Sequence, residues 1–574
     1  MEIMEKLSSS IIGILLYFVF HSNKLLSSSF YFSSFSPSIH FLVVSSSPNI
    51  AKPFHLGHFR ATVTGNFVQN INEAFGHKVI GINYIGDWGS QFDILTSAFS
   101  KYGDEIKFQR NPTEHLYKIY VQAHRDEQLL LSERQIAHGI SDGSEVTSLQ
   151  SMADNQAEEQ SRNTDFWQRV RKVTYDELKS NYKRMNIHFT SFEYESDYVK
   201  KAHLVVDKLL AMGLAFKSRD GLICISTEKA DDVNFSKQNI VLLKSDNSTL
   251  YLTRDIAAAI TRFNEYQFDR IHYVVEIGQR LHFQQLQYVL TQMGYNWPVL
   301  SVKNDNFVDY GSQSARDLLH VPFGRILGMS SRKGEGLFLS NILDNAQQFM
   351  LDRMKLSKNT RVIQNESADC ASLSQEDIAD HLGVTCLVTT MFGNPRLRPI
   401  KLNTFLGLPV TTANIPLSTT SSKGGELCGL TLQYCHARLC SLESRMISAG
   451  LLPSSVCTDQ GVTAYDVGCL IHEYDQLVQW PPETVNEQCF ITLANELCRF
   501  SSVLQTAYSN YEPHCILQYA LELASAVNCS WKRLPVLTCS RKEDQMIRLF
   551  IFVASRNVLA SCLRLMGVMP LKAI

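Results

Sequence analysis

One strand-helix-strand pattern near the beginning of the chain constrains its fold more than any other feature of the sequence. Two largely apolar runs, Ile39 to Val44 and Lys78 to Ile85, are typical of buried strands. Between them, apolar side chains recur every four residues from Phe59 to Phe75, which predicts one helix, and Gly76 stands where glycine often ends a helix. Strands joined through a helix pair in parallel, so residues 39–89 predict the start of a parallel sheet.

A similar unit follows later in the chain. Short apolar runs at Ile240 to Lys244 and Arg270 to Val275 predict strands. Periodic segments over Tyr251 to Tyr266 and Leu281 to Met293 predict helices. We interpret the two units as halves of one doubly wound parallel sheet, an α/β fold of the Rossmann-like class.

The remaining parts of the chain are predicted to be mainly helical. Residues 101–235 are more charged, with a helix over Asp165 to Met185 and strand character near Gly221 to Ser226, and are expected to be an insertion between the two halves. Beyond about residue 340 the strand patterns fade, which favours a C-terminal all-α bundle. Amphipathic helices are predicted over Ala464 to Val478, Cys489 to Tyr508, Glu512 to Val527 and Asp544 to Met566.

Composition narrows the class of protein without deciding its partner. With 574 residues, 45% of them hydrophobic, the chain can form several domains. Its 54 Lys and Arg balance 56 Asp and Glu, so a polyanion must be bound by local basic patches. The fourteen cysteines begin at Cys224 and contain no CxxC pair, and no histidine cluster completes a zinc pattern. We therefore expect reduced thiols and no protein-bound metal.

The N-terminal segment gives mixed signals about targeting. The apolar run Ile11 to Phe20 resembles the hydrophobic region of a signal peptide, but ten residues are too few to span a bilayer, so no stable membrane insertion is expected. Glu2 and Glu5 stand where a targeting peptide is usually cationic, and the first 44 residues contain no Arg. The serine-rich stretch from Ser27 to Ser38 has the composition of a linker.

The first chemical motif lies in the loop between the first strand and its helix. Residues 49–58 read NIAKPFHLGH, an HxGH motif at a helix N-terminus, where backbone N–H groups favour the phosphates of a nucleotide such as ATP. His55 and His58 can donate hydrogen bonds to developing charge, and Gly57 permits close approach of a base or ribose. A pair of surface histidines, or a metal pair, is the alternative that the motif leaves open.

A second motif strengthens the nucleotide interpretation. Gly86-Asp87-Trp88-Gly89 follows the second strand, in the crevice where doubly wound sheets bind ligands, although a structural Trp anchor also explains it. The sequence has no GxxxxGK[ST] motif and no GxGxxG that opens a helix, which disfavours P-loop and dinucleotide enzymes.

Four segments together resemble the class I arginyl-tRNA synthetases, in particular the mitochondrial and fungal type. They read SSPNIAKPFHLGHFR, INYIGDWGSQF, TLYLTRDIAAAI and GQRLHFQQL, and their order and spacing are similar to that family over residues 46–300. LQYCHARLCSLES and RNVLASCLRLMGVMP extend the resemblance into the C-terminal part. It implies an arginine–tRNA ligase that uses ATP to form arginyl-adenylate and then charges tRNA(Arg). The alternatives are a catalytically impaired synthetase-like tRNA-binding protein and an HxGH nucleotidyltransferase.

The resemblance assigns the arginine site to residues whose chemistry suits a guanidinium. Tyr251 and Asp255 are four residues apart on one helical face, and a carboxylate matches the planar fork of arginine. For Asp255, favourable placement near a helix N-terminus is the alternative. Gln279 matches a glutamine that lines the amino-acid pocket, and Asn49 matches a residue near the substrate amino and carboxyl groups. The family's glutamate at the end of the first strand is replaced by Val44.

The same resemblance assigns the catalytic and ATP-binding residues. His55, Gly57 and His58 bind ATP, and His282 approaches the nucleotide unless it is a satisfied structural histidine. The second class I signature is represented by GMSSRKG at residues 328–334, a basic loop or else a solvated turn. Its ATP-binding members are Met329, Ser330, Arg332 and Lys333. Because the usual lysine order is missing there, Lys52 is expected to join His55 and His58 in catalysis. Mg²⁺ is expected to arrive bound to ATP.

The resemblance also implies partners and a division into domains. Gln433, Tyr434 and Arg438 are assigned to tRNA binding, with a structural joint as an equal alternative. Residues 1–44 form an atypical segment in place of the family's tRNA-binding N-terminal domain, residues 45–340 the catalytic domain, 341–429 a connecting region, and 430–574 the helical anticodon-binding domain. The ligands are arginine, ATP and tRNA(Arg). We expect a monomer in the mitochondrial matrix, with the cytoplasm as the alternative compartment.

Overall fold

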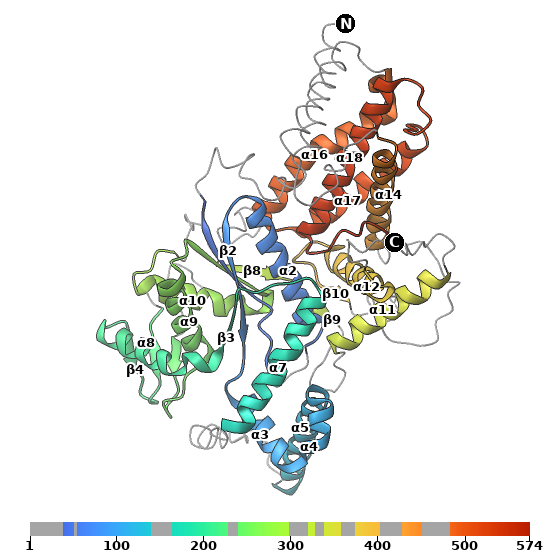
Figure 1. Ribbon diagram of the computed structural model, residues 1–574. Coiled ribbons are helices and arrows are strands. Elements are labelled where there is room, and N and C mark those ends of the chain that lie inside the picture. Colours follow the sequence, from blue (N-terminus) through green and yellow to red (C-terminus); the bar gives the residue numbers. More distant parts are fainter. Residues whose placement is uncertain are drawn as a thin grey trace.

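The computed structural model describes residues 38–50, 54–138, 164–227, 239–297, 319–327, 338–356, 373–401, 428–450 and 483–574. A central sheet carries helices on both faces, and a helical bundle stands at one end of it (Figure 1). The α/β class with a C-terminal all-α part is therefore confirmed.

The described strands of the central sheet are parallel and lie in the order β3-β2-β1-β7-β8. Their bounds are Ser191–Tyr194, Lys78–Ile85, His40–Ser45, Arg270–Glu276 and His320–Phe323. The predicted strand-helix-strand unit is confirmed, since β1 and β2 pair in parallel and are joined through helix α2, Leu56–Ala74. The central position of β1 follows from its five consecutive buried residues, because such a strand must be covered on both faces.

The alternation of side chains along β1 sends them into two separate cores. Val43 packs with α2, whose Phe59 and Phe67 are fully buried. Leu42 and Val44 face the opposite layer, and successive residues of a strand point to opposite faces. That layer contains α8 (Val199–Ala211), α9 (Tyr251–Tyr266) and α10 (Arg280–Gln292), drawn in green in Figure 1.

Two expectations about the sheet are wrong. The strand predicted at 240–244 exists as β6 (Ile240–Leu243), but it pairs antiparallel with β5 (Ile223–Ile225), which pairs with β4 (Ala215–Lys217) in a small separate sheet. The stretch 101–235 is not wholly an insertion, because β3 within it adds an edge strand to the central sheet. In both cases the apolar pattern identified a strand but not its partner, which is set by distant residues.

A domain boundary at residues 44 and 45 is also wrong, since it cuts through β1, the middle strand of the sheet. The mainly helical part of the region that follows β2 is confirmed by α3, α4, α5 and α7. Their bounds are Ser90–Tyr102, Glu105–Arg110, Pro112–His138 and Thr164–Arg184. Short 3-10 turns follow β3 (η1, Glu195–Tyr198) and β7 (η2, Ile277–Gln279).

Two helices connect the sheet to the bundle, α11 (Leu339–Leu356) and α12 (Gln375–Phe392). Before and after them, β9 (Ile326–Leu327) and β10 (Ile400–Lys401) pair in parallel. Residues up to 401 are thus tied back to the segment that leaves β8, so the sheet-bearing part of the chain extends beyond the predicted limit of residue 340.

The C-terminal bundle contains the predicted helices that fall on described residues. They are α16 (Gln488–Asn510), α17 (Pro513–Trp531) and α18 (Lys542–Leu565), joined by α14 (Cys428–Ser448) and a short turn, η6 (Glu483–Asn486). The helix predicted over 464–478 lies outside the described residues. Helix α18 is long and apolar enough to cross a membrane, but 89% of its most apolar window is buried in the bundle, as in the core helix of a globular domain.

The bundle rests directly on α2. At the end of α16, Tyr511 adopts a left-handed conformation with φ of 47° and its hydroxyl reaches Asn72 of α2 and Nε2 of His272 on β7, each at 3.0–3.1 Å. His77, just after α2, makes a 2.6 Å contact with the Tyr508 hydroxyl. The helix that begins at the HxGH motif therefore ends against the C-terminal bundle.

Candidate active site

The loops that follow β1 and β2 meet at the carboxyl edge of the sheet. Asn49 and Gly86 form a parallel bridge, with the Ile50 N–H donating to the Gly86 carbonyl and the Gly86 N–H to that of Pro48, both at 3.0 Å. The HxGH loop and the GDWG turn are thus held together by backbone hydrogen bonds, in the crevice where parallel sheets bind ligands.

The two histidines of HxGH lie face to face at the start of α2. Their ring centroids are 4.0 Å apart with an interplanar angle of 12°. His55 is the N-cap, and its Nδ1 accepts from the Gly57 N–H at 3.0 Å, while Nδ1 of His58 accepts from the His55 N–H at 3.4 Å. An Nδ1 that accepts a hydrogen bond places the proton of the neutral ring on Nε2. Both rings are therefore fixed as Nε2–H donors, which is what a phosphate requires.

The structure explains the glycine at position 57 by the neighbouring His55 side chain. A Cβ there would lie 2.8 Å from Cε1 of His55, closer than such atoms pack. The absence of a side chain makes room for the neighbouring imidazole, which then caps the helix. The predicted approach of a base or ribose to Gly57 stays a prediction.

The GDWG turn is anchored through its aspartate. Asp87 is buried, and its carboxylate accepts from the Ser196 N–H at 2.9 Å and from the Ser196 hydroxyl at 2.8 Å. Burial raises the pKa of Asp87 above its ordinary value, although the two hydrogen bonds oppose that shift. Trp88 is half-buried beside it. Asp87 therefore has a structural part in the turn, joining the end of β2 to η1.

The turn brings a residue from the second half of the fold into the crevice. Gly89 has a φ of +97°, and a Cβ there would lie 3.9 Å from the hydroxyl of Tyr251. Tyr251 is the first residue of α9 and is 51% exposed, so it lines the opening of the crevice. The structure thus brings the predicted Tyr251 to the loop that ends β2, a contact between segments far apart in sequence.

Asp255 occupies the next turn of α9 and faces α10. Its Oδ2 lies 2.7 Å from Nε2 of His282, and each side chain is about one fifth exposed. The first turn of α9 contains no acidic residue, and Asp255 lies beyond it, so the helix-dipole alternative gains no support. Gln279 ends η2, three residues before His282.

Glu195 is a site residue that the sequence reasoning missed. It is the first residue of η1, it is 5% exposed, and the Cβ position of Gly86 lies 3.6 Å from its Oε2 and 3.5 Å from Nδ2 of Asn49. Its Oε1 accepts from Nε of Arg254 at 2.7 Å. Burial raises the pKa of Glu195 to about 7, opposed by Arg254 and assisted by Asp255 and Asp87. The sequence analysis did not single out this segment, and its local signal is limited to two carboxylates, Glu193 and Glu195, two positions apart.

Arg60 is a second residue that sequence reasoning did not single out. It lies two positions after His58 on α2, and its guanidinium donates to four carbonyl oxygens, those of Gly324, Arg325, Arg396 and Arg398, at 2.7–3.4 Å. Burial lowers the pKa of Arg60 to about 10. Through it, the first turns of α2 hold β9, from which the chain runs on toward residues 328–334.

Val44 stands at the position where the resemblance to the synthetases implies a glutamate. It is 1% exposed, pairs with Ile82 and Tyr273 on the neighbouring strands, and belongs to the apolar layer beneath α9 and α10. In this chain the position is therefore occupied by a valine side chain that packs in the apolar core.

Several predicted site residues lie outside the described residues. They are Lys52, Met329, Ser330, Arg332 and Lys333. Within the described residues, no group of three or more His, Cys, Asp or Glu side chains is placed to hold a metal ion.

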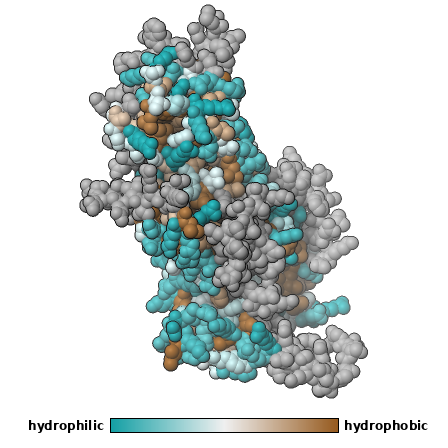
Figure 2. All heavy atoms as spheres, turned by 90° about the vertical axis from the view of Figure 1, so that its right-hand side faces the viewer, coloured by the Kyte–Doolittle hydropathy of each residue, from teal (hydrophilic) through white to brown (hydrophobic). Residues whose placement is uncertain are grey.

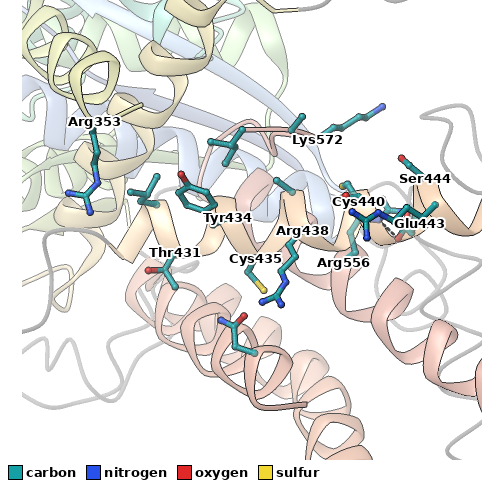
Figure 3. Close-up of a pocket in the computed structure, with 17 residues that line it drawn as sticks. Arg353, Thr431, Tyr434, Cys435, Arg438, Cys440, Glu443, Ser444, Arg556 and Lys572 are labelled. Carbon is teal, nitrogen blue, oxygen red and sulfur yellow. Dashed lines mark hydrogen bonds and ion pairs between the residues drawn. The ribbon is translucent and has the colours of Figure 1, made fainter. Parts of the chain in front are cut away.

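A groove of about 1110 Å³ lies along α14, far from the crevice in the sequence (Figure 3). Tyr434 is 38% exposed on its wall, and one turn later the guanidinium of Arg438 lies 4.1 Å from the centre of the Trp531 ring. Among the described residues that line it, cationic side chains outnumber acidic ones, of which Glu443 is one and pairs with Arg556 at 2.9 Å. The lining cations are Arg353, Arg438, Arg445, Arg556 and Lys572.

For Gln433 the structure supports the structural joint, which the sequence left as an equal alternative to tRNA binding. Gln433 is fully buried, its Nε2 donates to Oγ1 of Thr385 and to the Met569 carbonyl, and its Oε1 accepts from the Leu571 N–H. Since no polar atom is left for the surface, Gln433 joins α14 to α12 and the C-terminal segment. On the face of the molecule drawn in Figure 2, the described surface is mainly hydrophilic, with apolar side chains in small patches.

Comparison with protein families gives two matches that divide the chain as the fold does. Residues 23–398 match the catalytic domain of the class I tRNA synthetases for arginine, and residues 432–574 match the DALR anticodon-binding domain.

Individual relatives agree with these matches. A probable mitochondrial arginine–tRNA ligase of Mus musculus is 32% identical over 93% of this chain and 78% of its own length. A probable cytoplasmic arginine–tRNA ligase of Dictyostelium discoideum is 31% identical over 92% of this chain and 80% of its own. Among solved structures, the arginyl-tRNA synthetase of Thermus thermophilus has a TM-score of 0.63 at 18% identity, covering 94% of this chain and 83% of that one, and therefore shares the fold.

Proposed function

This chain belongs to the class I arginyl-tRNA synthetases, and from that premise we propose how its residues divide the work of an arginine–tRNA ligase. The enzyme joins arginine to tRNA(Arg) with ATP as the second substrate. In the proposed sequence of steps, the arginine carboxylate attacks the α-phosphorus of ATP, forming arginyl-adenylate and releasing pyrophosphate. A ribose hydroxyl at the end of the tRNA then attacks the carbonyl carbon, and AMP leaves.

The single observation that carries the site assignment is the meeting of four segments at one edge of the sheet. The bridge between Asn49 and Gly86, the approach of Tyr251 to Gly89, and the position of Glu195 beside Gly86 unite residues that are far apart in sequence. We assign the arginine guanidinium to Asp255 with Glu195 as a second carboxylate, and the rest of the amino acid to Asn49, Tyr251 and Gln279. Two carboxylates at one end favour a planar, positively charged guanidinium over a neutral side chain.

We assign the triphosphate to the start of α2. His55 and His58 present Nε2–H groups from stacked rings, and donors held in place before the reaction stabilise charge that develops on phosphate oxygens. Neither ring needs to take up a proton. Lys52 and the basic residues of the second signature are proposed to complete the phosphate site from their positions in the sequence. Mg²⁺ is proposed to enter with ATP, where it would neutralise phosphate charge.

We assign the tRNA to the groove along α14, where an exposed tyrosine and several cations lie together. Tyr434 provides a ring on which a base can stack, and Arg438, one turn later on α14, points to the other side of the helix and lies against the Trp531 ring (Figure 3). The excess of positive charge suits a phosphate backbone. We place the catalytic part at about residues 38–401 and the anticodon-binding part from residue 428 onward.

The remaining assignments concern assembly and compartment. We propose a monomer, and light scattering after size exclusion tests it. Mitochondrial and cytoplasmic relatives match at nearly the same identity, and we propose the mitochondrial matrix. Imaging of the full chain fused at its C-terminus to a fluorescent protein tests that choice, and a cytosolic signal would reject it.

The test of the function is pyrophosphate exchange into ATP with purified protein. We expect exchange that depends on arginine, that is not supported by lysine or citrulline, and that increases when tRNA(Arg) is added. Exchange without any amino acid would identify a nucleotidyltransferase. Binding of tRNA(Arg) without exchange would identify a synthetase-like protein that has lost catalysis.

A further inference from the structure

The carboxylate assigned to the substrate guanidinium already has a basic partner. His282, the third residue of α10, points its Nε2 at Oδ2 of Asp255 over 2.7 Å, and both side chains are largely shielded from solvent. This contact joins the second turn of α9, which begins at Tyr251, to the first turn of α10, which directly follows Gln279.

The other cations near this carboxylate are engaged elsewhere. Arg254, the residue before Asp255, pairs with Glu195 at 2.7 Å, and Arg262 pairs with Glu193 at 2.9 Å. Within the described residues, His282 is the group that forms an ion pair with Asp255. An imidazole in this place can carry either no charge or one positive charge, whereas the guanidinium of a substrate arginine is always charged.

We propose that His282 is a positioning residue of the arginine site, which in its neutral form orients the Asp255 carboxylate and in its charged form occupies the place of the substrate guanidinium. This inference rests on the proposed function, because it takes Asp255 to be the guanidinium ligand. The neutral ring with its proton on Nε2 donates to Oδ2 and leaves Oδ1 for the substrate. The imidazolium satisfies the same carboxylate with a full charge and repels a second cation.

The charged and titratable groups around the Asp255 and His282 pair determine whether His282 is protonated. Around the pair, several elements contribute charged or titratable groups. They are Arg254 and Arg262 on α9, Glu195 on η1, Glu193 on β3, Tyr84 on β2, Tyr273 on β7, His320 on β8 and Arg280 on α10. Burial alone lowers the pKa of His282, but the hydrogen bond and the charge of Asp255 outweigh it and raise the pKa above its ordinary value. His320, 4.6 Å from Phe283 ring to ring, remains neutral because burial lowers its pKa to about 4.

The consequence is that arginine binding expels a proton. Free enzyme holds His282 protonated below its raised pKa, and the arriving guanidinium favours the neutral ring. Arginine affinity should therefore fall as the pH falls, by up to roughly tenfold for each pH unit below the His282 pKa. Binding of ATP, whose site lies at α2, should not follow this dependence.

Titration calorimetry of arginine binding to the full-length enzyme tests the proposal, repeated in buffers of different ionisation enthalpy between pH 6 and 8. His282→Gln keeps a donor nitrogen at the place of Nε2 but does not titrate. We expect proton release and a pH-dependent Kd in the wild type, and neither in His282→Gln. His188→Gln changes an exposed histidine after α7 and should behave as the wild type.

Glu195 is the competing source of a proton, because its pKa of about 7 lies in the same range and its ionisation would give the same sign. If His282→Gln releases as many protons as the wild type and Glu195→Gln does not, the proposal is overturned. It is also overturned if His282→Gln raises the KM for ATP and leaves that for arginine unchanged. Asp255→Asn separates failure of the proposed arginine site from failure of the role of His282. Unaltered arginine binding in Asp255→Asn would reject the site itself. Weakened binding in Asp255→Asn, together with proton release that persists in His282→Gln, would reject only the role of His282.

Discussion

At the scale of the residue, the proposed recognition of arginine depends most on Asp255. It presents one carboxylate at the edge of the sheet, beside His282 and within the field of Glu195. A carboxylate binds a guanidinium through two parallel hydrogen bonds and full charge, and no neutral side chain of the same size offers both.

We expect Asp255→Asn to weaken arginine binding far more than ATP binding. The amide keeps the volume but loses the charge, and a buried guanidinium without its carboxylate costs roughly 3 to 5 kcal/mol, or more than a hundredfold in Kd. Separate calorimetric titrations with arginine and with a non-hydrolysable ATP analogue measure the two effects. Equal weakening of both ligands would indicate a folding defect, and unchanged arginine affinity would contradict the assignment.

At the scale of the element, α2 carries proposed catalytic residues at its start and packs against the bundle at its end. Its first residues hold the two imidazoles, the next turn holds Arg60 against four carbonyl oxygens, and its last turns meet the bundle through Asn72. A helix fixed at both ends is a rigid support for donors that must not reorganise during the reaction.

His55→Ala and His58→Ala are each expected to lower the rate of adenylate formation by roughly a hundredfold or more, because one preorganised donor is worth about 3 kcal/mol. Since the rings stack and each accepts a backbone N–H, the double variant should lose less than the product of the two effects. Single-turnover pyrophosphate release measures the rates, and thermal melting checks the fold. Normal rates in either single variant would remove that histidine from catalysis.

Helix α14 carries a pH-sensitive contact with the C-terminal segment. His436 is buried, its Nδ1 lies 2.8 Å from the Leu571 carbonyl, and burial lowers its pKa to about 4. The group is neutral in the folded protein and titrates near 6.5 when unfolded, so its contribution to stability is present above pH 6.5 and is lost as the pH falls toward 4.

We therefore expect the free energy of unfolding to fall between pH 7 and pH 5 by about 2 kcal/mol on account of His436. His436→Asn keeps a donor at the place of Nδ1 and cannot titrate, so it should be less sensitive to acid than the wild type. Urea unfolding at the two pH values measures the difference. Identical pH dependence in both proteins would show that other groups control acid stability.

At the scale of the whole molecule, the catalytic part and the bundle share a buried polar contact. The Tyr511 hydroxyl lies within 3.1 Å of both Asn72 and His272, so one group from the bundle satisfies polar atoms from α2 and β7. Arg396, before the bundle, donates in the same region to the carbonyls of Tyr511 and Asn510. The helix to which we assign ATP binding and the anticodon-binding domain are thus packed as one unit.

Tyr511→Phe should lower the free energy of unfolding by about 1–3 kcal/mol, because it leaves buried polar atoms without their partner. Tyr508→Phe is the matched control, since it also removes a hydroxyl between α16 and the catalytic part. Its hydroxyl contacts His77, whose side chain is half-buried, whereas that of Tyr511 contacts the buried Asn72 and His272. Urea unfolding of the two variants measures the costs. A larger loss in Tyr508→Phe than in Tyr511→Phe would contradict this account of the interface.

The sequence by itself determined the elements whose signals are local. The strand Lys78–Ile85 and the helix Tyr251–Tyr266 have the predicted bounds, because a run of apolar residues or a period of four is written in consecutive positions. The HxGH and GDWG motifs were found for the same reason, and with the Tyr251 and Asp255 pair they indicated the family.

The tertiary structure alone decided which of these elements meet and which polar groups are buried between them. It placed β6 in a separate sheet, added β3 to the central one, buried Gln433 in a joint, and brought Glu195 to Gly86 and His282 to Asp255. Strand partners and buried ion pairs depend on residues tens to hundreds of positions apart, and their free energy arises only when packing excludes water from them. A local sequence pattern does not show which residues packing will shield from water. It therefore indicates which residues can do the chemistry, but not which of them share a site.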